Sequence, residues 1–276
     1  MKKLRFGPAG VPLSSPRRST IDGIVHVRNL GLDAMEMEFV RGVKMGERMA
    51  REAGKIAKDR DVILTAHGPY FINLNSEDRG KVEASKRRIY ETARIAWLAG
   101  GYSIVFHAGY YGKLSAEKVY ENVMREMKEL IQKLDDEGIK IWVRPETTGK
   151  RTQFGTVEEI VRLSEELENV LPCIDFAHLH ARSGGKYNTY EEFREILEYV
   201  ERHLGREALD NMHIHVSGIE YGNKGEKRHL NLQESDMNYP DLLKVWKEFD
   251  IKGVVISESP NLEGDALLLK RKYDGL

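Results

Sequence analysis

Three ionisable side chains, Asp175, His178 and His180, interrupt the apolar segment LPCIDFAHLH at residues 171–180. The segment begins like a buried strand, and an ionisable group in or beside such a strand is costly unless something pairs with it. A carboxylate followed closely by imidazoles is a set of ligands that suits a metal ion. The segment therefore suggests a metal site whose remaining ligands come from elsewhere in the chain.

The same residue types recur at the ends of other short apolar segments. Eight candidate ligands fall in the last part of a predicted strand or just beyond it: His67, His107, Glu146, Asp175, His178, His213, His215 and Glu258. Any one of these histidines alone would more simply be a satisfied core or surface residue. The full set comes from six strands, and bound cations are the simplest way to stabilise so many ionisable groups in one place.

The types of ligand narrow the choice of metal. Imidazoles mixed with carboxylates, without a thiolate, suit zinc, manganese or iron better than calcium or magnesium. The candidates are too many for one ion, so three or four ligands per metal and a bridging carboxylate predict two or three zinc ions, with manganese as the alternative. Metal ions about 3.5–4 Å apart recur in phosphatases, nucleases and polymerases.

The elements that must position these residues alternate along the chain. Strands are predicted at 3–9, 33–39, 62–67, 102–107, 139–146, 170–178, 212–218 and 253–259. Charged amphipathic helices are predicted between most of them, at 45–58, 76–99, 115–137, 156–168, 189–204, 239–249 and 262–273.

Eight strand–helix units predict a single (β/α)8 TIM barrel over residues 1–276, with parallel strands joined by helical crossovers. A doubly wound open sheet is the alternative, but no GxGxxG loop follows any strand. In a barrel, catalytic residues project from the carboxyl ends of the strands, which is where the candidate ligands lie.

Composition excludes several classes of protein. The 43 basic and 44 acidic residues give a net charge of −1, so there is no global attraction to nucleic acid or anionic lipid, although a local basic rim remains possible. No apolar run reaches the ~20 residues of a membrane span, and we expect no signal peptide. Cys173 is the single cysteine and cannot form an internal disulfide, which favours a cytoplasmic protein. The 32% of charged residues resembles a thermophile surface.

Seven segments follow one another from about residue 60 to the C-terminus: HGPYFINL (67–74), VFHAGYY (105–111), ETTG (146–149), CIDFAHLH (173–180), MHIHVSG (212–218), EKRHLNL (226–232) and ISESPN (256–261). In order and spacing they resemble the motifs of the endonuclease IV family, the zinc-dependent apurinic/apyrimidinic endonucleases built on a TIM barrel. The resemblance covers roughly three quarters of the chain.

The resemblance implies a role for each matching residue. His67 and His107 resemble ligands of one zinc ion, and Glu146 resembles the carboxylate that bridges it to a second and orients the nucleophile. Asp175, Glu258 and one histidine of MHIH resemble the other ligands of the second ion.

The third zinc ion and the DNA contacts follow in the same way. His178 and His229 resemble ligands of the third ion. Tyr70 matches a tyrosine of the family that enters the DNA beside the lesion. Arg41 and Lys44 occupy the position of a basic loop that penetrates DNA, although solvated loop charges would look the same.

Two positions depart from the family pattern. The family has an aspartate two residues before the third-zinc histidine, where this chain has Lys227, and we expect Glu226 to replace it. The MHIH motif offers both His213 and His215, which lie on one face of a strand; alignment from Met212 favours His213, while spacing allows either.

His180 has no counterpart in the family, and we expect it to be a histidine of the pocket wall or of a loop.

The implied activity is hydrolysis of duplex DNA on the 5′ side of abasic sites in base excision repair, by a monomer. One alternative is a sugar isomerase or epimerase of the xylose-isomerase-like barrels, in which Glu36 or Glu38 would move the proton. Another is a catalytically silent DNA- or zinc-binding relative, an alternative that rests on Lys227.

Overall fold

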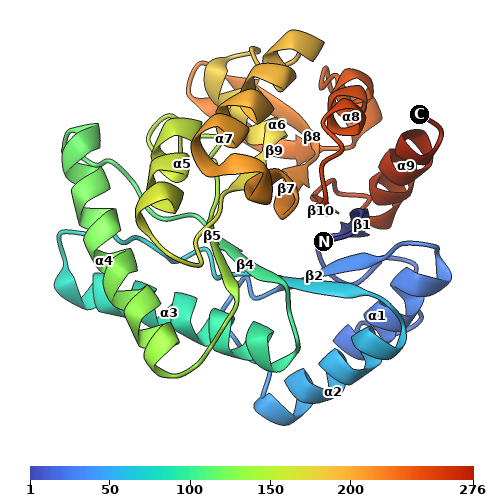
Figure 1. Cartoon of the computed structure of the whole chain (residues 1–276), viewed down its shortest axis with the longest axis horizontal. Helices are drawn as coiled ribbons and strands as arrows, with labels where there is room; N and C mark the ends of the chain where they lie inside the picture. Colours follow the sequence, from blue (N-terminus) through green and yellow to red (C-terminus); the bar gives the residue numbers. More distant parts are fainter.

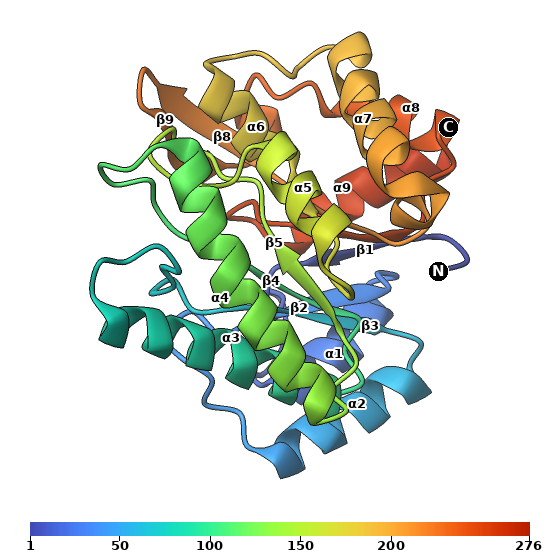
Figure 2. The same ribbon diagram turned by 60° about the vertical axis from the view of Figure 1, so that its left-hand side comes forward.

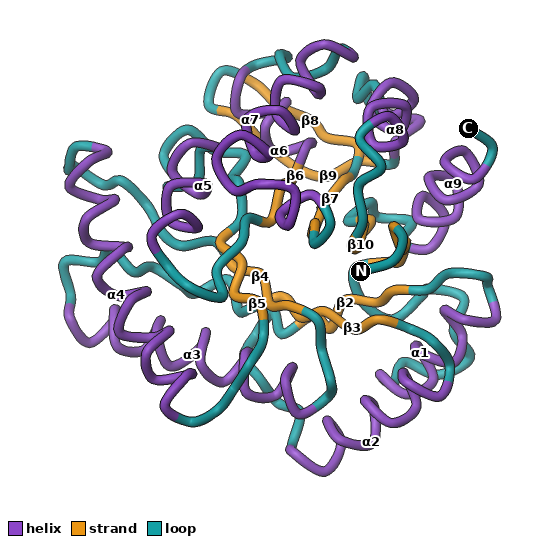
Figure 3. Tube along the Cα trace, in the orientation of Figure 1, coloured by secondary structure: helices purple, strands orange, loops and turns teal.

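Eight parallel strands form the centre of the molecule and the helices surround them (Figures 1 and 3). The computed structural model describes all 276 residues. The barrel strands are β1 (Leu4–Pro8), β2 (Ala34–Glu38), β3 (Ile63–His67), β4 (Ser103–Phe106), β5 (Trp142–Pro145), β6 (Cys173–Asp175), β7 (Met212–Val216) and β10 (Gly253–Ser257). All eight predicted strands are present, and the prediction of a TIM barrel is confirmed.

Two four-stranded sheets, β1-β10-β7-β6 and β2-β3-β4-β5, make up the barrel. A parallel bridge from Ala9 to Glu36 joins them on one side, and a parallel bridge from Glu146 to Cys173 joins them on the other. The strands therefore form a closed ring. Because they are parallel, all their carboxyl ends lie at the same end of the barrel.

The helices form the outer layer. They are α1 (Thr20–Asn29), α2 (Glu47–Asp59), α3 (Arg79–Leu98), α4 (Ala116–Asp136), α5 (Val157–Glu166), α6 (Phe176–Ser183), α7 (Tyr190–Leu209), α8 (Tyr239–Glu248) and α9 (Glu263–Asp274), with a short 3-10 turn, η1 (Leu232–Glu234). None of the helices is long and apolar enough to cross a membrane.

The hydrophobic core is divided very unequally by the barrel wall. A cluster of 63 buried residues includes the helix faces and the outward-facing strand positions. A separate cluster contains only Ala34, Val254 and Ile256. Polar side chains such as Glu36, Thr65 and Ser103 are fully buried. Apolar packing thus fixes the barrel from outside, while the strands can carry polar groups toward the centre.

The segment LPCIDFAHLH corrects the strand prediction for residues 170–178. β6 ends at Asp175, and helix α6 begins at the next residue. The Asp175 side chain caps this helix, because its Oδ1 accepts a hydrogen bond of 2.7 Å from the backbone N–H of His178. His178 is therefore held on the first turn of a helix rather than at the end of a strand.

An antiparallel hairpin was not expected from the sequence. Strands β8 (Gly218–Gly222) and β9 (Gly225–Leu230) follow β7 and extend beyond the barrel rim, against α6 (Figure 2). The hairpin carries Glu226 and His229. The segment EKRHLNL thus belongs to an excursion between β7 and α8.

Gly7 lies where β1 passes closest to β2, and a substitution there tests the closure of the barrel. A Cβ atom at Gly7 would be 1.8 Å from the carbonyl oxygen of Ala34. Because this neighbour is backbone and cannot rotate away, we expect Gly7→Ala to lower the free energy of unfolding by about 3 kcal/mol. At Gly46 a Cβ would meet nothing within 4 Å, so Gly46→Ala should cost less than about 1 kcal/mol. Urea denaturation of both variants measures the difference, and equal losses would contradict this account of closure.

Candidate metal centre

Glu146 is the carboxylate around which the candidate ligands gather. It follows directly after β5, and its side chain is completely buried. Its Oε2 lies 3.2 Å from Nε2 of His67 and 3.0 Å from Nε2 of His107. Its Oε1 lies 3.2 Å from Nδ1 of His215. The two oxygens of one carboxylate thus face ligands on different sides, an arrangement that suits a bridge between two cations.

Asp175 and Glu258 surround the Oε1 side of Glu146. Oε1 of Glu258 lies 3.4 Å from Nδ1 of His215. Oδ2 of Asp175 is buried and has no hydrogen-bond partner, although Nδ1 of His178 lies 3.3 Å away. An unpartnered carboxylate oxygen in a water-poor site is costly, and a cation would satisfy it. The donor set therefore fits a metal ion at this position.

A third group of ligands lies between α6 and the hairpin. Nε2 of His178 is 3.4 Å from Nε2 of His229. The Glu226 carboxylate lies 3.7 Å from the first nitrogen and 3.8 Å from the second. Lys227 instead contacts Glu220 at 3.2 Å on the exposed side of the hairpin. Glu226 is thus the acidic residue of the hairpin that faces the two histidines.

Gly149 of the ETTG motif makes room for this third group. A Cβ atom there would lie 2.7 Å from Oε2 of Glu226 and 3.0 Å from the His178 ring. The hairpin is also tied to the same loop, because the N–H of Glu226 donates to the carbonyl of Gly149 at 3.0 Å. The β5–α5 loop therefore sets how closely the hairpin ligands approach the barrel.

Backbone carbonyls orient three of the histidines. Nδ1 of His67 lies 2.8 Å from the carbonyl of Gly68, and Nδ1 of His178 lies 3.0 Å from the carbonyl of Thr147. Nδ1 of His229 lies 3.2 Å from the carbonyl of Glu258. A carbonyl can only accept, so each Nδ1 carries the hydrogen. Nε2 is then the free ligand atom, and it faces the centre.

The pKa values of the centre favour positive charge on the histidines next to the buried carboxylate. Without a metal ion, protons on the imidazoles supply this charge. Burial disfavours protonation of His67, but its hydrogen bond to Glu146 and the charge of that carboxylate raise its pKa to about 10. Burial raises the pKa of Glu146, but the charges of His107 and His215 outweigh burial and hold it well below its usual range. Metal ions and protons would compete for the same imidazole nitrogens.

Asp175 and Glu38 resist ionisation. Burial raises the pKa of Asp175 to about 6, with the charges of Glu258 and Glu146 acting in the same direction. Burial and the charge of Glu36 raise the pKa of Glu38 to about 8. Glu38 lies at the carboxyl end of β2, beside the centre.

Of the two histidines of MHIH, only His215 lies beside Glu146 among the candidate metal ligands. Nε2 of His213 lies 3.2 Å from Oε2 of Glu36, and its Nδ1 lies 2.7 Å from Oγ of Ser103. Both histidines point into the barrel, but His213 is two residues nearer the amino end of β7, so it lies one layer deeper. Side chains alternate between the two faces of a strand, so residues 213 and 215 share a face. This alternation could not predict which of them lies deeper in the barrel.

The predicted DNA-contacting residues lie at the rim. Tyr70 is 65% exposed, its ring centre is 6.5 Å from that of His67, and the neighbouring Phe71 is 66% exposed. Arg41 and Lys44 lie on the loop after β2, where they line a cavity of about 530 Å³ together with Glu38. Basic side chains therefore lie on the β2 side of the barrel mouth, in the cavity that Glu38 also lines.

His180 lies outside the centre and connects three segments. Its Nδ1 is 2.8 Å from the carbonyl of Lys186, and its Nε2 is 3.1 Å from Oδ1 of Asp236. The Tyr221 hydroxyl donates to the other oxygen of Asp236 at 2.7 Å. His180 thus helps to tie the hairpin to α6. Asp236 is 56 residues away in the sequence, so no local pattern indicated this role.

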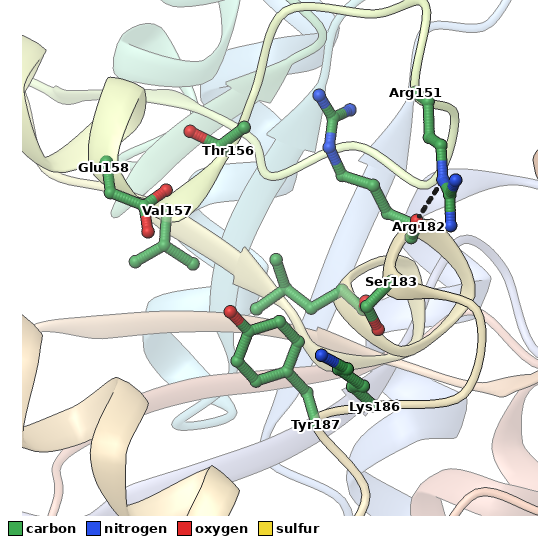
Figure 4. Close-up of a pocket in the computed structure, with 9 residues that line it drawn as sticks. Arg151, Thr156, Val157, Glu158, Arg182, Ser183, Lys186 and Tyr187 are labelled. Atoms are coloured by element: carbon green, nitrogen blue, oxygen red, sulfur yellow. Dashed lines mark hydrogen bonds between the residues drawn. The ribbon is translucent and has the colours of Figure 1, made fainter.

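A separate cavity of about 430 Å³ lies between the β5–α5 loop and α6 (Figure 4). Leu179, Arg182 and Ser183 line it from one face of α6, and none of the candidate metal ligands does. Arg182 donates to the carbonyls of Lys150 and Gln153 at 2.6 and 2.9 Å. This arginine therefore braces the loop that follows Glu146.

Comparison with known proteins indicates the family. The family model described as the xylose isomerase-like TIM barrel matches residues 24–272. An uncharacterized protein of Methanocaldococcus jannaschii is 48% identical over 273 residues, which cover 99% of this chain and 98% of that protein. A probable endonuclease 4 of Mycoplasma pneumoniae is 24% identical over 204 residues, which cover 72% of this chain and 68% of that protein.

Two solved structures superpose equally well. A D-tagatose 3-epimerase-like protein has a TM-score of 0.73 at 18% identity and covers 100% of this chain and 97% of its own. Endonuclease IV from Thermus thermophilus has a TM-score of 0.73 at 17% identity and covers 98% of this chain and 99% of its own. At these identities the likeness shows the fold alone, and the fold does not distinguish a nuclease from an epimerase.

In the metal-free protein, two buried histidines should titrate far apart. Burial disfavours protonation of both, but Glu146 raises the pKa of His67 to about 10, whereas Glu36 does not overcome burial at His213, whose pKa falls to about 4. At about pH 7, His67 should be charged and His213 neutral. Nitrogen-15 NMR of the imidazoles in chelator-treated protein measures both values, and titration of both near 6.5 would contradict the described electrostatics.

The two shifts act on stability in opposite directions. The raised pKa of His67 contributes stability that is fully present below its unfolded value of about 6.5. That contribution is lost as the pH rises through about 10. The lowered pKa of His213 contributes stability that is present above about 6.5. It is lost as the pH falls through about 4.

Proposed function

This chain belongs to the xylose isomerase-like TIM barrel family, and we propose that it hydrolyses phosphodiester bonds of duplex DNA on the 5′ side of abasic sites. The observation that carries the proposal is the arrangement around Glu146, whose two oxygens face different histidines within 3.2 Å. Curated relatives named probable endonuclease 4 support the assignment.

The proposal requires two or three divalent cations, for which zinc is the first candidate and manganese the second. When bound, such ions would polarise a phosphodiester and lower the pKa of a water molecule toward neutrality. His67, His107 and Glu146 would hold one ion, and His215, Asp175 and Glu258 would complete the second with Glu146. The third would be held by His178, Glu226 and His229.

The carboxylates of the centre must be neutralised before an anionic substrate can bind. Glu146, Asp175, Glu258 and Glu226 bring four carboxyl groups to one end of the barrel. A phosphodiester is itself an anion, so the carboxylates would repel it if nothing neutralised them. In the metal-free protein the protonated histidines would compensate part of this charge, so metal loading is required above all for activity.

Three residues at the rim of the barrel would provide contacts to DNA that the metal centre does not make. Arg41 and Lys44 would contact backbone phosphates on the β2 side, an attraction that weakens with salt. Tyr70 is exposed beside His67 and would occupy the space left by an extruded nucleotide. An abasic nucleotide has no base to unstack, so its extrusion into a pocket costs little. The protein would act as a monomer, because one chain presents all these groups.

A sugar isomerase or epimerase is the second candidate, and Glu38 is the observation that favours it. Glu38 lines the cavity on the β2 side, and its raised pKa of about 8 suits a group that gives and takes protons near neutral pH. Solved sugar epimerases share the fold. The large number of histidines at the centre favours the nuclease, because such isomerase sites hold more carboxylate and fewer imidazoles.

Glu146→Gln tests the proposed function. Losing the charge of the bridging carboxylate should lower the metal content and reduce incision of a duplex containing one abasic analogue by more than ~100-fold. Glu126→Gln is the matched control, because Glu126 is equally buried but lies on α4, where it pairs with Arg79 and Lys86. Metal analysis and gel-based incision assays on all three proteins provide the measurement.

The outcomes separate the candidates. Fully metallated wild-type protein that leaves the abasic duplex intact would overturn the nuclease assignment. Conversion of a ketose by that same preparation would establish the epimerase instead. Two bound ions with normal incision would remove only the role of Glu226 at the third site.

A further inference from the structure

Glu36 lies beneath the metal centre, in a position that the proposed chemistry leaves without a role. Its side chain is completely buried on β2. The Thr65 hydroxyl donates to its Oε2 at 2.8 Å, and Nε2 of His213 lies 3.2 Å from the same oxygen. Its Oε1 lies 2.9 Å from Nε2 of His215. A carboxylate buried so deeply is retained only if its neighbours compensate its charge.

We infer that Glu36 is a positioning residue, which holds His215 in the tautomer and orientation that present Nδ1 to the metal centre. Both ring nitrogens of His215 face carboxylates, Nε2 that of Glu36 at 2.9 Å and Nδ1 that of Glu146 at 3.2 Å. When a metal ion occupies the Nδ1 side, the single hydrogen of the neutral ring must be on Nε2. A neutral imidazole then has its lone pair on Nδ1. That atom lies 3.2 Å from Glu146 and 3.4 Å from Glu258, which places it on the metal side.

His215 differs in two ways from the three histidines oriented by backbone carbonyls. His67, His178 and His229 turn Nε2 toward the centre and give Nδ1 to a carbonyl. His215 turns Nδ1 toward the centre, and its other nitrogen faces a charged carboxylate. A carboxylate partner makes an imidazole a more basic ligand than a carbonyl partner does. Glu36 would therefore strengthen metal binding by His215 and by no other histidine of the centre.

His213 and Ser103 complete the support of Glu36. Oγ of Ser103 lies 2.7 Å from Nδ1 of His213. If the serine hydroxyl donates there, the hydrogen of His213 must be on Nε2, which faces Oε2 of Glu36. Thr65 of β3 and the two histidines of β7 then surround the carboxylate from two strands. This explains why MHIH carries two histidines although only His215 reaches Glu146.

A further buried ion is the alternative use of these groups. Cys173, His213 and His215 lie close enough together to hold one, and Glu36 is adjacent. That arrangement would engage both nitrogens of His215 with cations and so require a deprotonated imidazole. The positioning role needs only the neutral ring, and we therefore favour it over a further ion.

The test compares metal binding of wild-type protein, Glu36→Gln and the buried control Glu126→Gln. The expected result is a full complement of metal in every protein at saturation, with one ion bound ~10–100-fold more weakly in Glu36→Gln, measured by competition with a chelator. The visible spectrum of cobalt-loaded Glu36→Gln should also change, because a ligand has moved. Glu126→Gln should match wild type in both measurements, since it removes a buried carboxylate elsewhere.

A measurement on wild-type protein keeps the test independent of how well the variant folds. Nitrogen-15 NMR of the zinc-loaded protein should show His215 protonated on Nε2 and bound through Nδ1. The opposite tautomer, or unchanged affinity and spectrum in Glu36→Gln, would overturn the positioning role. A thiolate-to-cobalt charge-transfer band that disappears in Cys173→Ser, together with one whole metal equivalent, would replace it with the buried ion site.

The inference rests on the metal centre of the proposed function and not on its substrate. Absence of incision in a fully metallated protein would leave the role of Glu36 intact. Failure of wild-type protein to bind any metal would overturn both.

Discussion

Placing several carboxylates and imidazoles together in a region with little water is the constraint on which the rest of this structure depends. Glu146 is fully buried, and its charge cannot be stabilised by solvent. The histidines around it compensate that charge when they carry protons, and they are equally suited to compensate it by sharing metal ions. The capped helix α6 and the hairpin of β8 and β9 each bring further candidate metal ligands to the centre. The loops around them hold those side chains in place.

In the barrel, the residues that provide stability are separate from those that form the metal centre. Apolar packing is concentrated outside the barrel wall, in the cluster of 63 buried residues between strands and helices. The interior contains only a small apolar cluster and can therefore hold polar layers. Glu36 and His213 form one such layer, and Glu146 with its histidines forms the next. The lower layer orients the upper one, so the centre has support on the side away from solvent.

Much of this arrangement could be predicted from the sequence because the strand signal is local. His67 and His107 end or follow apolar segments, and the parallel order of the strands brings such ends together. LPCIDFAHLH was harder, because the same residues can extend a strand or cap a helix, and the hydrogen bond from His178 to Asp175 decides for the helix. The depth of His213 relative to His215, and the contacts of His180 with Asp236, depend on residues far apart in the chain. No local pattern contains that information.

We propose that the Glu146 carboxylate would hold two metal ions, and anomalous diffraction from crystals of the zinc-loaded protein tests this most directly. Data collected at the zinc absorption edge should show one peak between Oε2 of Glu146, His67 and His107. A second peak should lie between Oε1 of Glu146 and His215, beside Asp175 and Glu258. A single peak, or peaks that leave the Glu146 carboxylate without a metal contact, would contradict the account.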